Sequence, residues 1–326
     1  METVRWGVVG TGGMAAKMAA TLASVEEARV VAVGSRSLDT AEFFAGAHGI
    51  EAAVGSHDAV ATCEDVDVVY VATTNELHHA NVLASIAAGK PVLCEKPLAL
   101  NRAQAHEMIE SARQADLFLM EAMWMRFQPF LAKVDELIES GAIGNVGHLQ
   151  ATFGFPANPD PQRRWFSRSL GGGSLLDLGI YPVTLAYHVL GPPTSCSTEA
   201  DVSTEGIDRQ ITIASTHPGG AMSTLSASIL SDTANEAVIS GTKGRIRVHA
   251  PFHHSRLVTL EREGAVVATF DVGYDGSGLE FQIDHVHRCL EAGHLESPTM
   301  PSTDSLAILA WMDAVRRQSG VMYPGE

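Results

Sequence analysis

Apolar and polar residues follow two different rhythms along the chain. Up to about residue 121, short runs rich in β-branched residues alternate with alanine-rich stretches in which apolar residues recur at helical spacing. This alternation is typical of a parallel sheet with crossover helices. The predicted strands are residues 4–9, 30–34, 66–72, 92–95 and 117–121, and the predicted helices are residues 41–48, 80–88 and 103–115.

After a predicted helix at residues 130–140, strand candidates follow one another with few helices between them. They are residues 146–155, 197–204, 210–216, 221–229, 237–240, 245–249, 257–261 and 266–270, interrupted by a helix at about 174–190 and followed by helices near 279–292 and 303–318. This pattern predicts one large, mostly antiparallel, open sheet. We therefore expect an α/β plus α+β protein, with a doubly wound parallel sheet in residues 1–122 and an α+β domain in residues 123–326.

A glycine-rich loop follows the first predicted strand. Residues 10–15 fit the pattern G-x-G-x-x-[GA], in which glycines permit a tight turn and let the backbone approach a pyrophosphate. The N–H groups at the start of the next helix can then bind the anion. A purely structural turn is the alternative, but the position at the first strand-to-helix junction favours a dinucleotide site. The residues expected to bind the cofactor here are Gly10, Thr11, Gly12, Gly13 and Met14.

The end of the second predicted strand indicates which dinucleotide is bound. A free ribose 2'-hydroxyl is usually held by an Asp or Glu about 20 residues after the glycine loop. Here the strand ends Gly34-Ser35-Arg36-Ser37, with no carboxylate before Asp39. Arg36 can pair with a 2'-phosphate, and the hydroxyls of Ser35 and Ser37 can add hydrogen bonds, so we expect NADP(H) in preference to NAD(H). Alternatively, Arg36 is a solvated surface residue and Ser37 caps the next helix.

Polar residues follow two of the buried strands. Ligands of an open parallel sheet bind outside the carboxyl ends of its strands, and both residues 73–78 and Glu95-Lys96-Pro97 lie at such ends. Proline restricts Lys96 to an extended backbone and ends the strand, so we expect the ammonium group to point into the ligand crevice. A salt bridge at the strand end is the structural alternative for Lys96.

A second polar cluster is expected in the C-terminal part of the chain. Residues 171–181 read GGGSLLDLGIY. If they open a helix, Asp177 and Tyr181 are four residues apart and share a face, so both can project into a cleft. The glycines allow close approach of other backbone or of a ligand. From these residues alone, a face that is merely solvated or hydrogen-bonded between domains stays open as the alternative.

The composition narrows the possible functions. With 326 residues, of which 45% are hydrophobic and 18% charged, the chain can bury a large core. A formal net charge of -16 argues against nucleic acid or an anionic membrane as a partner. No apolar run approaches the about 20 residues that span a bilayer. The strand expected directly after Met1 leaves no room for a signal peptide.

Cysteine and histidine spacing bears on metals and redox compartment. The four cysteines are widely spaced, without the density of a disulfide scaffold, so we expect free thiols in a reducing cytoplasm. The pairs His78-His79, His253-His254 and His285-x-His287 lack the H-E-x-x-H or Cys/His spacing of a zinc site. We therefore expect no metal.

Three of these stretches together resemble the glucose-fructose oxidoreductase/inositol dehydrogenase/rhizopine catabolism (Gfo/Idh/MocA) superfamily. They are residues 10–15, residues 87–97 (AAGKPVLCEKP) and residues 172–181. Within it, the chain most resembles the dimeric dihydrodiol dehydrogenases and the NADP-dependent D-xylose dehydrogenases, on residues 118–127, 239–244 and 320–324. The resemblance extends over essentially the whole chain. It implies an N-terminal Rossmann domain, a C-terminal substrate domain and a homodimer formed through the C-terminal sheet.

The resemblance also implies catalytic roles. In the dihydrodiol dehydrogenase branch, the lysine and tyrosine matching Lys96 and Tyr181 are the catalytic pair, whereas many other members have a histidine in place of the tyrosine. A tyrosine with a pKa of ~10 is a poor base near neutrality. A nearby ammonium and a cationic nicotinamide would favour tyrosinate, although which residue holds the proton stays open. Asp177 would position Lys96 or a second substrate hydroxyl.

Further contacts follow from the same resemblance. On the residues alone, a capping or core role for His78 and plain core positions for the aromatic rings are alternatives. The implied cofactor contacts are Thr73, Thr74, Asn75, His78, Glu95, Lys96 and Arg164, and the implied substrate contacts are Trp124, Phe153, Trp165 and Tyr181.

We therefore expect an NADP(H)-dependent dehydrogenase or reductase that acts on a secondary alcohol, or the matching carbonyl, of a sugar, diol or polyol. Where dihydrodiol dehydrogenases have a tryptophan near the pocket edge, residues 250–254 read APFHH, which weakens an aromatic dihydrodiol as the substrate. Two alternatives stay open: an NAD-dependent glycoside hydrolase of the superfamily and a non-catalytic, nucleotide-sensing regulator. Arg36 argues against the first, and the presence of Lys96 and Tyr181 argues against the second.

Overall fold

A computed structural model describes residues 3–160 and 163–326, and the chain divides into two compact units. The first unit comprises Met1–Trp124 and Gly276–Leu306, and the second comprises Met125–Asp275 and Ala307–Glu326. The division after Trp124 lies next to the boundary expected at residue 122. Residues 276–306, expected in the C-terminal domain, instead pack with the first unit, where the indole N–H of Trp6 donates to His287 Nε2 at 3.1 Å.

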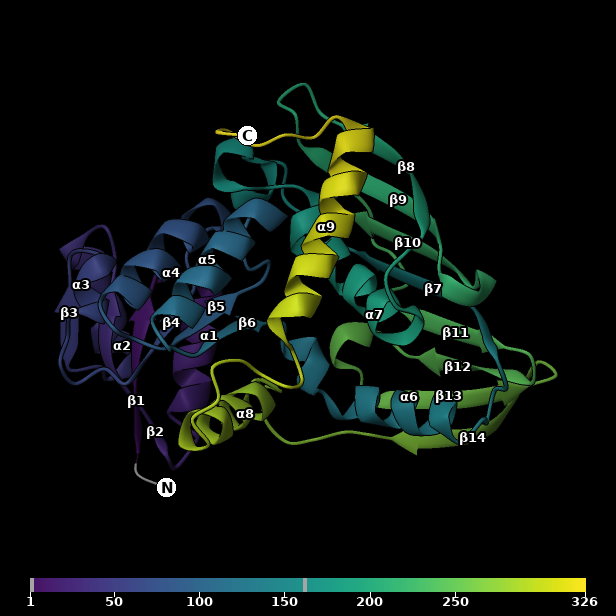
Figure 1. Ribbon diagram of the computed structural model, residues 1–326, viewed down its shortest axis with the longest axis horizontal. Helices are drawn as coiled ribbons and strands as arrows, with labels where there is room; N and C mark the ends of the chain where they lie inside the picture. The colour runs from purple at the N-terminus through teal and green to yellow at the C-terminus, as the bar shows by residue number, and fades with distance from the viewer. Residues whose placement is uncertain (1–2, 161–162) are drawn as a thin grey trace. The chain divides into compact units, whose positions relative to one another are not determined.

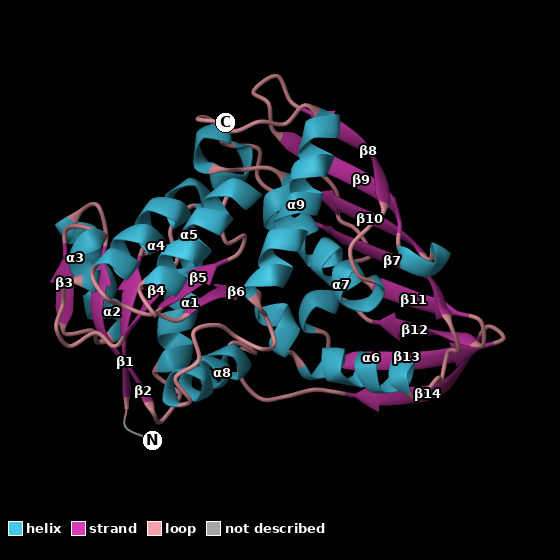
Figure 2. Ribbon diagram, viewed as in Figure 1, coloured by secondary structure: helices cyan, strands magenta, loops and turns pink. Residues whose placement is uncertain are grey.

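The first unit contains a parallel sheet with the strand order β3-β2-β1-β4-β5-β6 (Figures 1 and 2). Its strands are β1 (Val4–Val9), β2 (Ala28–Gly34), β3 (Ala52–Val54), β4 (Val68–Val71), β5 (Val92–Glu95) and β6 (Leu119–Ala122). The three strands β4, β5 and β6 are buried along their whole length, as expected for strands covered on both faces. This is the doubly wound order of the Rossmann fold, which confirms the expected fold class.

Helices cover both faces of this sheet. Right-handed crossovers place α1 and α2 on one face and α4 and α5 on the other, and each of these pairs is in contact (Figure 1). The helices of the unit are α1 (Gly13–Leu22), α2 (Leu38–His48), α3 (Asp58–Ala61), α4 (His78–Ala87), α5 (Arg102–Gln114) and α8 (Glu280–Glu291). The short elements β3 and α3 were not predicted, because runs of three and four residues carry no periodic signal.

The second unit contains a mostly antiparallel sheet with the order β14-β13-β12-β11-β7-β10-β9-β8, in which β7 and β10 pair in parallel. Its strands are β7 (Val146–Gly154), β8 (Ser195–Val202), β9 (Asp208–Thr216), β10 (Met222–Ser228), β11 (Ala237–Gly241), β12 (Gly244–Val248), β13 (Leu257–Arg262) and β14 (Ala265–Asp271). The registers place Leu225 opposite Ala151 and Ile213, and Ile239 opposite Leu149. These five side chains are buried, so they form the core face of the sheet.

Helices cover that core face. Figure 2 shows α6 (Pro129–Glu139) and α7 (Ile180–Leu190) packed along the sheet, which they contact at β12 and β13 and at β7 and β10, respectively. The opposite face carries polar, exposed side chains, including Gln150, Thr212 and Thr224. Helix α9 (Ser302–Ser319) begins in the first unit and ends in the second. Within the part of the chain that the structure describes, no helix is both long and apolar enough to cross a membrane.

Candidate functional site

The loop after β1 has the geometry of an anion-binding turn. Gly10 has φ +107°, and a Cβ atom there would lie 2.7 Å from the carbonyl oxygen of Ala72, so only glycine fits. By contrast, a Cβ atom on Gly12 or Gly13 would meet no other atom within 4 Å, so the space beside this part of the loop is open. Gly12 caps α1 without a side-chain hydrogen bond, and the first turn of the helix has no acidic residue. This part of the loop therefore fits a pyrophosphate group. Thr11 and Met14 beside it are half-buried.

An exposed cation ends β2. The side chain of Arg36 is exposed, and the first carboxylate after the strand is Asp39, in the first turn of α2. The hydroxyl of Ser37 accepts a hydrogen bond from the Thr40 N–H at 3.4 Å. Ser37 is therefore the N-cap of α2, which is the structural role that the sequence analysis considered for it. Burial lowers the pKa of His57, and the nearby charge of Arg36 lowers it further.

His78 joins the two strand ends at which ligand contacts were predicted. It is fully buried, with Nδ1 2.8 Å from the carbonyl oxygen of Pro97 and Nε2 3.2 Å from that of Thr73. The Thr73 hydroxyl also accepts a hydrogen bond from Asn81. These contacts give His78 a structural role between the ends of β4 and β5. Of the other residues expected there, Thr74 is half-buried and Asn75 is buried.

Lys96 lies at the carboxyl end of β5 among buried carboxylates. Its exposed fraction is only 9%, and the neighbouring Glu95, also buried, accepts a hydrogen bond from the Tyr70 hydroxyl. Glu121 of β6, 2% exposed, accepts from the Leu98 N–H at 3.0 Å and from the Ser305 hydroxyl at 2.6 Å. Burial raises the pKa of Glu121, although these hydrogen bonds and the charge of Lys96 oppose the rise. Glu121 thus anchors the backbone at Leu98, two residues after Lys96, a role that the sequence did not reveal.

A second lysine of the first unit lies against a predicted substrate residue. The ammonium group of Lys17, on α1, is 4.5 Å from the ring centre of Trp124, which is buried. Burial lowers the pKa of Lys17, while the charges of Glu280 and Glu95 raise it. The cation–π contact orients Trp124. Sequence reasoning did not single out Lys17, because its helical position gives no sign of the partner.

In the second unit, Asp177 forms an ion pair with Arg164. The Asp177 side chain is 2% exposed, and its Oδ2 lies 3.0 Å from a guanidinium nitrogen of Arg164, which also lies over the ring of Trp165. Asp177 belongs to a π-helical turn, Leu175–Gly179, that precedes α7. The turn is wider than an α-helical turn, so the argument that residues four apart share a face does not apply across it. Such π-helical turns are frequent at functional sites.

Tyr181, at the start of α7, is surrounded by aromatic rings. Its ring centre lies 5.5 Å from that of Phe153 and 4.7 Å from that of His253. Phe155 meets Trp165 edge to face at 5.1 Å. The predicted substrate residues Phe153 and Tyr181 are therefore neighbours. His253 is the third member of this cluster. The sequence analysis named it only as part of residues 250–254, which differ from the dihydrodiol dehydrogenases.

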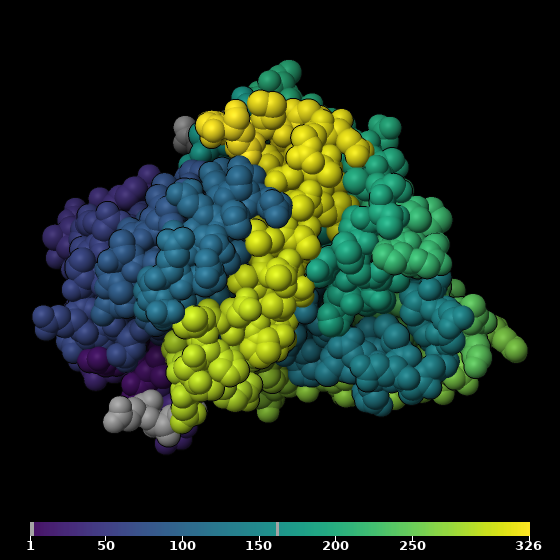
Figure 3. Space-filling model, in the orientation of Figure 1, coloured from purple at the N-terminus to yellow at the C-terminus, as the bar shows by residue number. Residues whose placement is uncertain are grey.

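The backbone leading to Asp177 is held by two buried side chains. Asp208 Oδ2 accepts from the Ser174 hydroxyl at 2.9 Å and from the Leu175 N–H at 2.6 Å, and the Tyr323 hydroxyl donates to the Gly172 carbonyl at 2.7 Å. Burial raises the pKa of Asp208 to about 6. The last residues of the chain reach the surface in Figure 3, where they are yellow, but Tyr323 among them is buried. No local pattern identified Asp208, whose partners are 33 and 34 residues away.

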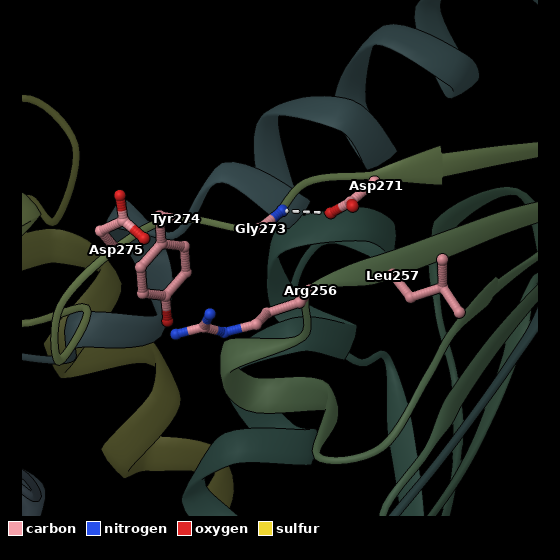
Figure 4. Close-up of a pocket in the computed structure, with 6 residues that line it drawn as sticks. All are labelled: Arg256, Leu257, Asp271, Gly273, Tyr274 and Asp275. Atoms are coloured by element: carbon pink, nitrogen blue, oxygen red, sulfur yellow. Dashed lines mark hydrogen bonds between the residues drawn. The ribbon is translucent and has the colours of Figure 1, made fainter.

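A cavity of about 770 Å³ lies elsewhere in the second unit (Figure 4). Its lining includes Arg256, whose guanidinium lies 4.7 Å from the Tyr274 ring centre, but it includes none of the predicted site residues. Among residues 3–160 and 163–326, no three His, Cys, Asp or Glu side chains gather closely enough to hold a metal ion.

Comparisons with known proteins agree with the fold. Residues 4–123 match the family described as oxidoreductase family, NAD-binding Rossmann fold, and residues 131–247 match the GFO/IDH/MocA C-terminal domain. The trans-1,2-dihydrobenzene-1,2-diol dehydrogenase of Xenopus laevis is 36% identical over 98% of this chain and 99% of its own. The human enzyme of the same name is 34% identical over 98% of both chains.

Two solved structures are similar over nearly the whole chain. One is an aldose-aldose oxidoreductase from Caulobacter crescentus complexed with glycerol, with a TM-score of 0.88, 25% identity and 98% of both chains covered. The other is a 3-ketoreductase from Actinomadura kijaniata in complex with NADP and TDP-benzene, with a TM-score of 0.89, 27% identity, and 97% of this chain and 98% of that chain covered. Together with the two family matches, these similarities confirm the resemblance. The chain therefore belongs to the GFO/IDH/MocA family of oxidoreductases, with an NAD-binding Rossmann fold.

Proposed function

We propose that this protein is an NADP(H)-dependent oxidoreductase that transfers hydride between nicotinamide and a secondary alcohol, or its carbonyl, on a sugar, diol or polyol. The observation that carries the proposal is Lys96, a nearly buried lysine at the carboxyl end of β5 in a family of oxidoreductases. The names of its relatives point to related substrates, since they include a cyclic diol and aldoses. All of these substrates carry neighbouring hydroxyl groups.

Arg36 supports NADP(H) as the cofactor. It is an exposed cation that follows β2. A carboxylate at this strand end would repel a 2'-phosphate, but the nearest acidic residue along the sequence is Asp39, in the first turn of α2. Ser35 and Ser37 flank it, while the open loop at Gly12 and Gly13 would receive the pyrophosphate. The structure of the Actinomadura ketoreductase contains NADP. Bound nicotinamide supplies the acceptor or the donor of the hydride.

Lys96 and Tyr181 would manage the proton of the reacting hydroxyl. Lys96 comes from the first unit, where its charge acts on the buried Glu121, and it would donate a hydrogen bond to the substrate oxygen. Tyr181 comes from the second unit, where Phe153 and His253 hold its ring, and it would accept the hydroxyl proton during oxidation. Asp177, paired with Arg164, would orient a further substrate hydroxyl.

The test is the absorbance of reduced nicotinamide, followed with NADP⁺ and NAD⁺ in parallel against aldoses, polyols and dihydrodiols. We expect one substrate group to reduce NADP⁺ faster than NAD⁺. Glycoside cleavage without net reduction of either cofactor would instead indicate a hydrolase. Tight NADPH binding, with no turnover in either direction, would indicate a nucleotide-sensing regulator.

We also propose that the protein forms a homodimer in the cytoplasm. The exposed face of the second unit's sheet, with Gln150, Thr212 and Thr224, would be buried against a second copy of the chain. The free thiols of the four cysteines suit a reducing compartment.

A further inference from the structure

Residues 321–326, which follow α9, are attached to the last turns of that helix (both are yellow in Figure 1). The buried Arg316 of α9 donates to both carboxylate oxygens of Glu326, at 2.6 and 2.9 Å, and to Asp313 at 2.7 Å. Glu326 also accepts from the Tyr323 N–H at 2.9 Å, and the Arg316 guanidinium lies 5.1 Å from the Tyr323 ring centre. Charge-assisted, bidentate hydrogen bonds of this kind are strong, so they fix the position of Tyr323.

The side chain of Tyr323 reaches the glycine-rich loop that precedes Asp177. The ring is buried, and the hydroxyl donates to the carbonyl oxygen of Gly172 at 2.7 Å. Burial raises the pKa of Tyr323 well above its usual value, so the hydroxyl keeps its proton and acts as a donor. Tyr323 therefore joins the segment after α9 to a loop that lies 151 residues earlier in the chain.

Gly172 lies directly against the segment that carries Arg164. A Cβ atom on Gly172 would lie 2.2 Å from the carbonyl oxygen of Arg164 and 2.8 Å from that of Trp165, so the two stretches of backbone are in close contact. The Gly173 N–H donates to the Trp165 carbonyl at 3.0 Å. The side chain of Arg164 in turn pairs with Asp177, in the π-helical turn after the glycines. The Gly172 carbonyl is thus held where the backbone around both members of this ion pair meets.

We propose that Tyr323 is a positioning residue, whose hydroxyl, acting through Gly172, sets the geometry of the Arg164–Asp177 ion pair. This inference rests on the proposed function, in which that pair orients a substrate hydroxyl. A buried carbonyl requires a hydrogen-bond partner, so removal of the Tyr323 hydroxyl lets the loop shift toward another donor. Small displacements of the groups that orient a substrate lower the rate strongly.

The first test is Tyr323→Phe, which keeps the ring and removes the hydroxyl. For the best substrate of the wild type among aldoses, polyols and dihydrodiols, we expect kcat/KM to fall about 10-fold, mainly through KM. The Kd of NADPH should stay within about 2-fold of wild type, because the glycine loop that receives the pyrophosphate belongs to the first unit. Tyr274→Phe is the matched control, since the Arg256 guanidinium lies 4.7 Å from the Tyr274 ring centre, and it should leave KM unchanged.

A double-mutant cycle with Asp177→Asn separates positioning from a general loss of stability. If Tyr323 acts through the ion pair, Tyr323→Phe should change kcat/KM less than about 2-fold in the Asp177→Asn background. A general loss of stability would lower kcat/KM by the same factor in both backgrounds. Such an equal loss, or unchanged kinetics in Tyr323→Phe alone, would overturn the proposal. Thermal unfolding of each variant checks that it is folded.

Amide hydrogen exchange tests the inference without any turnover. In Tyr323→Phe, the amides of residues 171–176 should exchange at least about 5-fold faster than in wild type, while those of β11 and β12 in the same unit should be unchanged. Tyr274→Phe should change neither group. Faster exchange of residues 171–176 in a protein that turns over no substrate would support the anchoring role of Tyr323 and refute the proposed function. Unchanged exchange in Tyr323→Phe would overturn the inference, whether or not the enzyme is active.

Discussion

Single residues determine which chemistry the chain can support, and burial changes what each one can do. Lys96 is nearly buried beside Glu95 and Glu121, so its ammonium group acts in a medium of lower dielectric than water. Arg36 is exposed at the end of β2, where it can meet a ligand from solvent. Both residues were proposed from the sequence alone, because a charged residue close after an apolar strand departs from the pattern of the strand.

Replacing Lys96 by methionine should abolish turnover while preserving cofactor binding. Methionine keeps most of the side-chain volume but removes the ammonium group that is proposed to hold the substrate oxygen. We expect kcat/KM to fall at least about 10²-fold, with the Kd of NADPH, measured by fluorescence titration, within about 3-fold of wild type. Lys133→Met, in the second unit where Lys133 pairs with Glu136, is the matched control. Retained activity in Lys96→Met would remove Lys96 from the mechanism.

Replacing Arg36 by alanine should weaken NADP⁺ binding selectively. Losing charge-assisted hydrogen bonds to a 2'-phosphate is expected to raise the Kd of NADP⁺ about 10- to 100-fold and to leave the Kd of NAD⁺ nearly unchanged. Arg29 lies in β2, the strand that precedes Arg36, and it is exposed and pairs with Glu51, so Arg29→Ala is the control. Equal effects on both dinucleotides would exclude a 2'-phosphate contact by Arg36.

At the scale of elements, the π-helical turn Leu175–Gly179 is held by side chains from segments that are distant in the sequence. Gly173 has φ +121°, and a Cβ atom there would lie 2.2 Å from Asp208 Oδ1, so the loop and the carboxylate fit only with glycine. Asp208 opens β9, and Tyr323 lies near the C-terminus. The helix predicted at residues 174–190 matches the π-helical turn and α7. The conformation at its start depends on hydrogen bonds to Asp208 and Tyr323, which lie far along the chain.

Asp208→Asn should flatten part of the pH dependence of stability. The pKa of Asp208 is raised from 3.8 to about 6 by burial, so the folded state keeps a proton that the unfolded chain loses above pH 4. The free energy of unfolding should thus fall between about pH 4 and pH 6, by roughly 3 kcal/mol from this group, and then level off.

The check is urea denaturation of wild type and Asp208→Asn between pH 4 and pH 7. Because asparagine does not ionise, the stability of the variant relative to wild type should rise with pH across this window. The comparison isolates Asp208 from other titrating groups, including Glu121, whose pKa is also raised by burial. A constant difference across the window would show that Asp208 is ionised throughout.

At the scale of the whole molecule, helices α6 and α7 cover one face of the second unit's sheet, and no helix of the described residues covers the other face. Alternation along β7, β9 and β10 sends Leu149, Ile213 and Leu225 into the core and Thr212 and Thr224 to the surface. The middle of this face, at Gln150, Thr212 and Thr224, is uncharged, whereas Glu199 lies opposite Thr212 and Arg247 opposite Val238 nearer its edges. An uncharged middle with charges around it favours the proposed contact with a second copy.

Thr224→Arg should convert the proposed dimer into a monomer. Thr224 lies on a central strand, opposite Gln150 and Ala214, and a symmetric interface would bury two new charges at once. Sedimentation velocity should show the loss of the dimer, with thermal unfolding as a check of folding. Thr204→Arg changes an exposed residue in the β8–β9 loop and should leave the dimer intact. A dimeric Thr224→Arg variant would place the interface elsewhere.

The sequence by itself determined the features that depend on local pattern. Strand and helix positions follow from apolar spacing, the glycine loop from the backbone freedom of glycine, and the positions of Arg36 and Lys96 from their place at strand ends. The tertiary structure alone decided the contacts between residues far apart in the chain. These include Asp208 with the Ser174 turn, Glu121 with Leu98 and Ser305, and the stacking of His253 on Phe153. Such pairs leave no trace in local periodicity, because a side chain's partner depends on how the elements pack, whereas the element itself depends on its own residues.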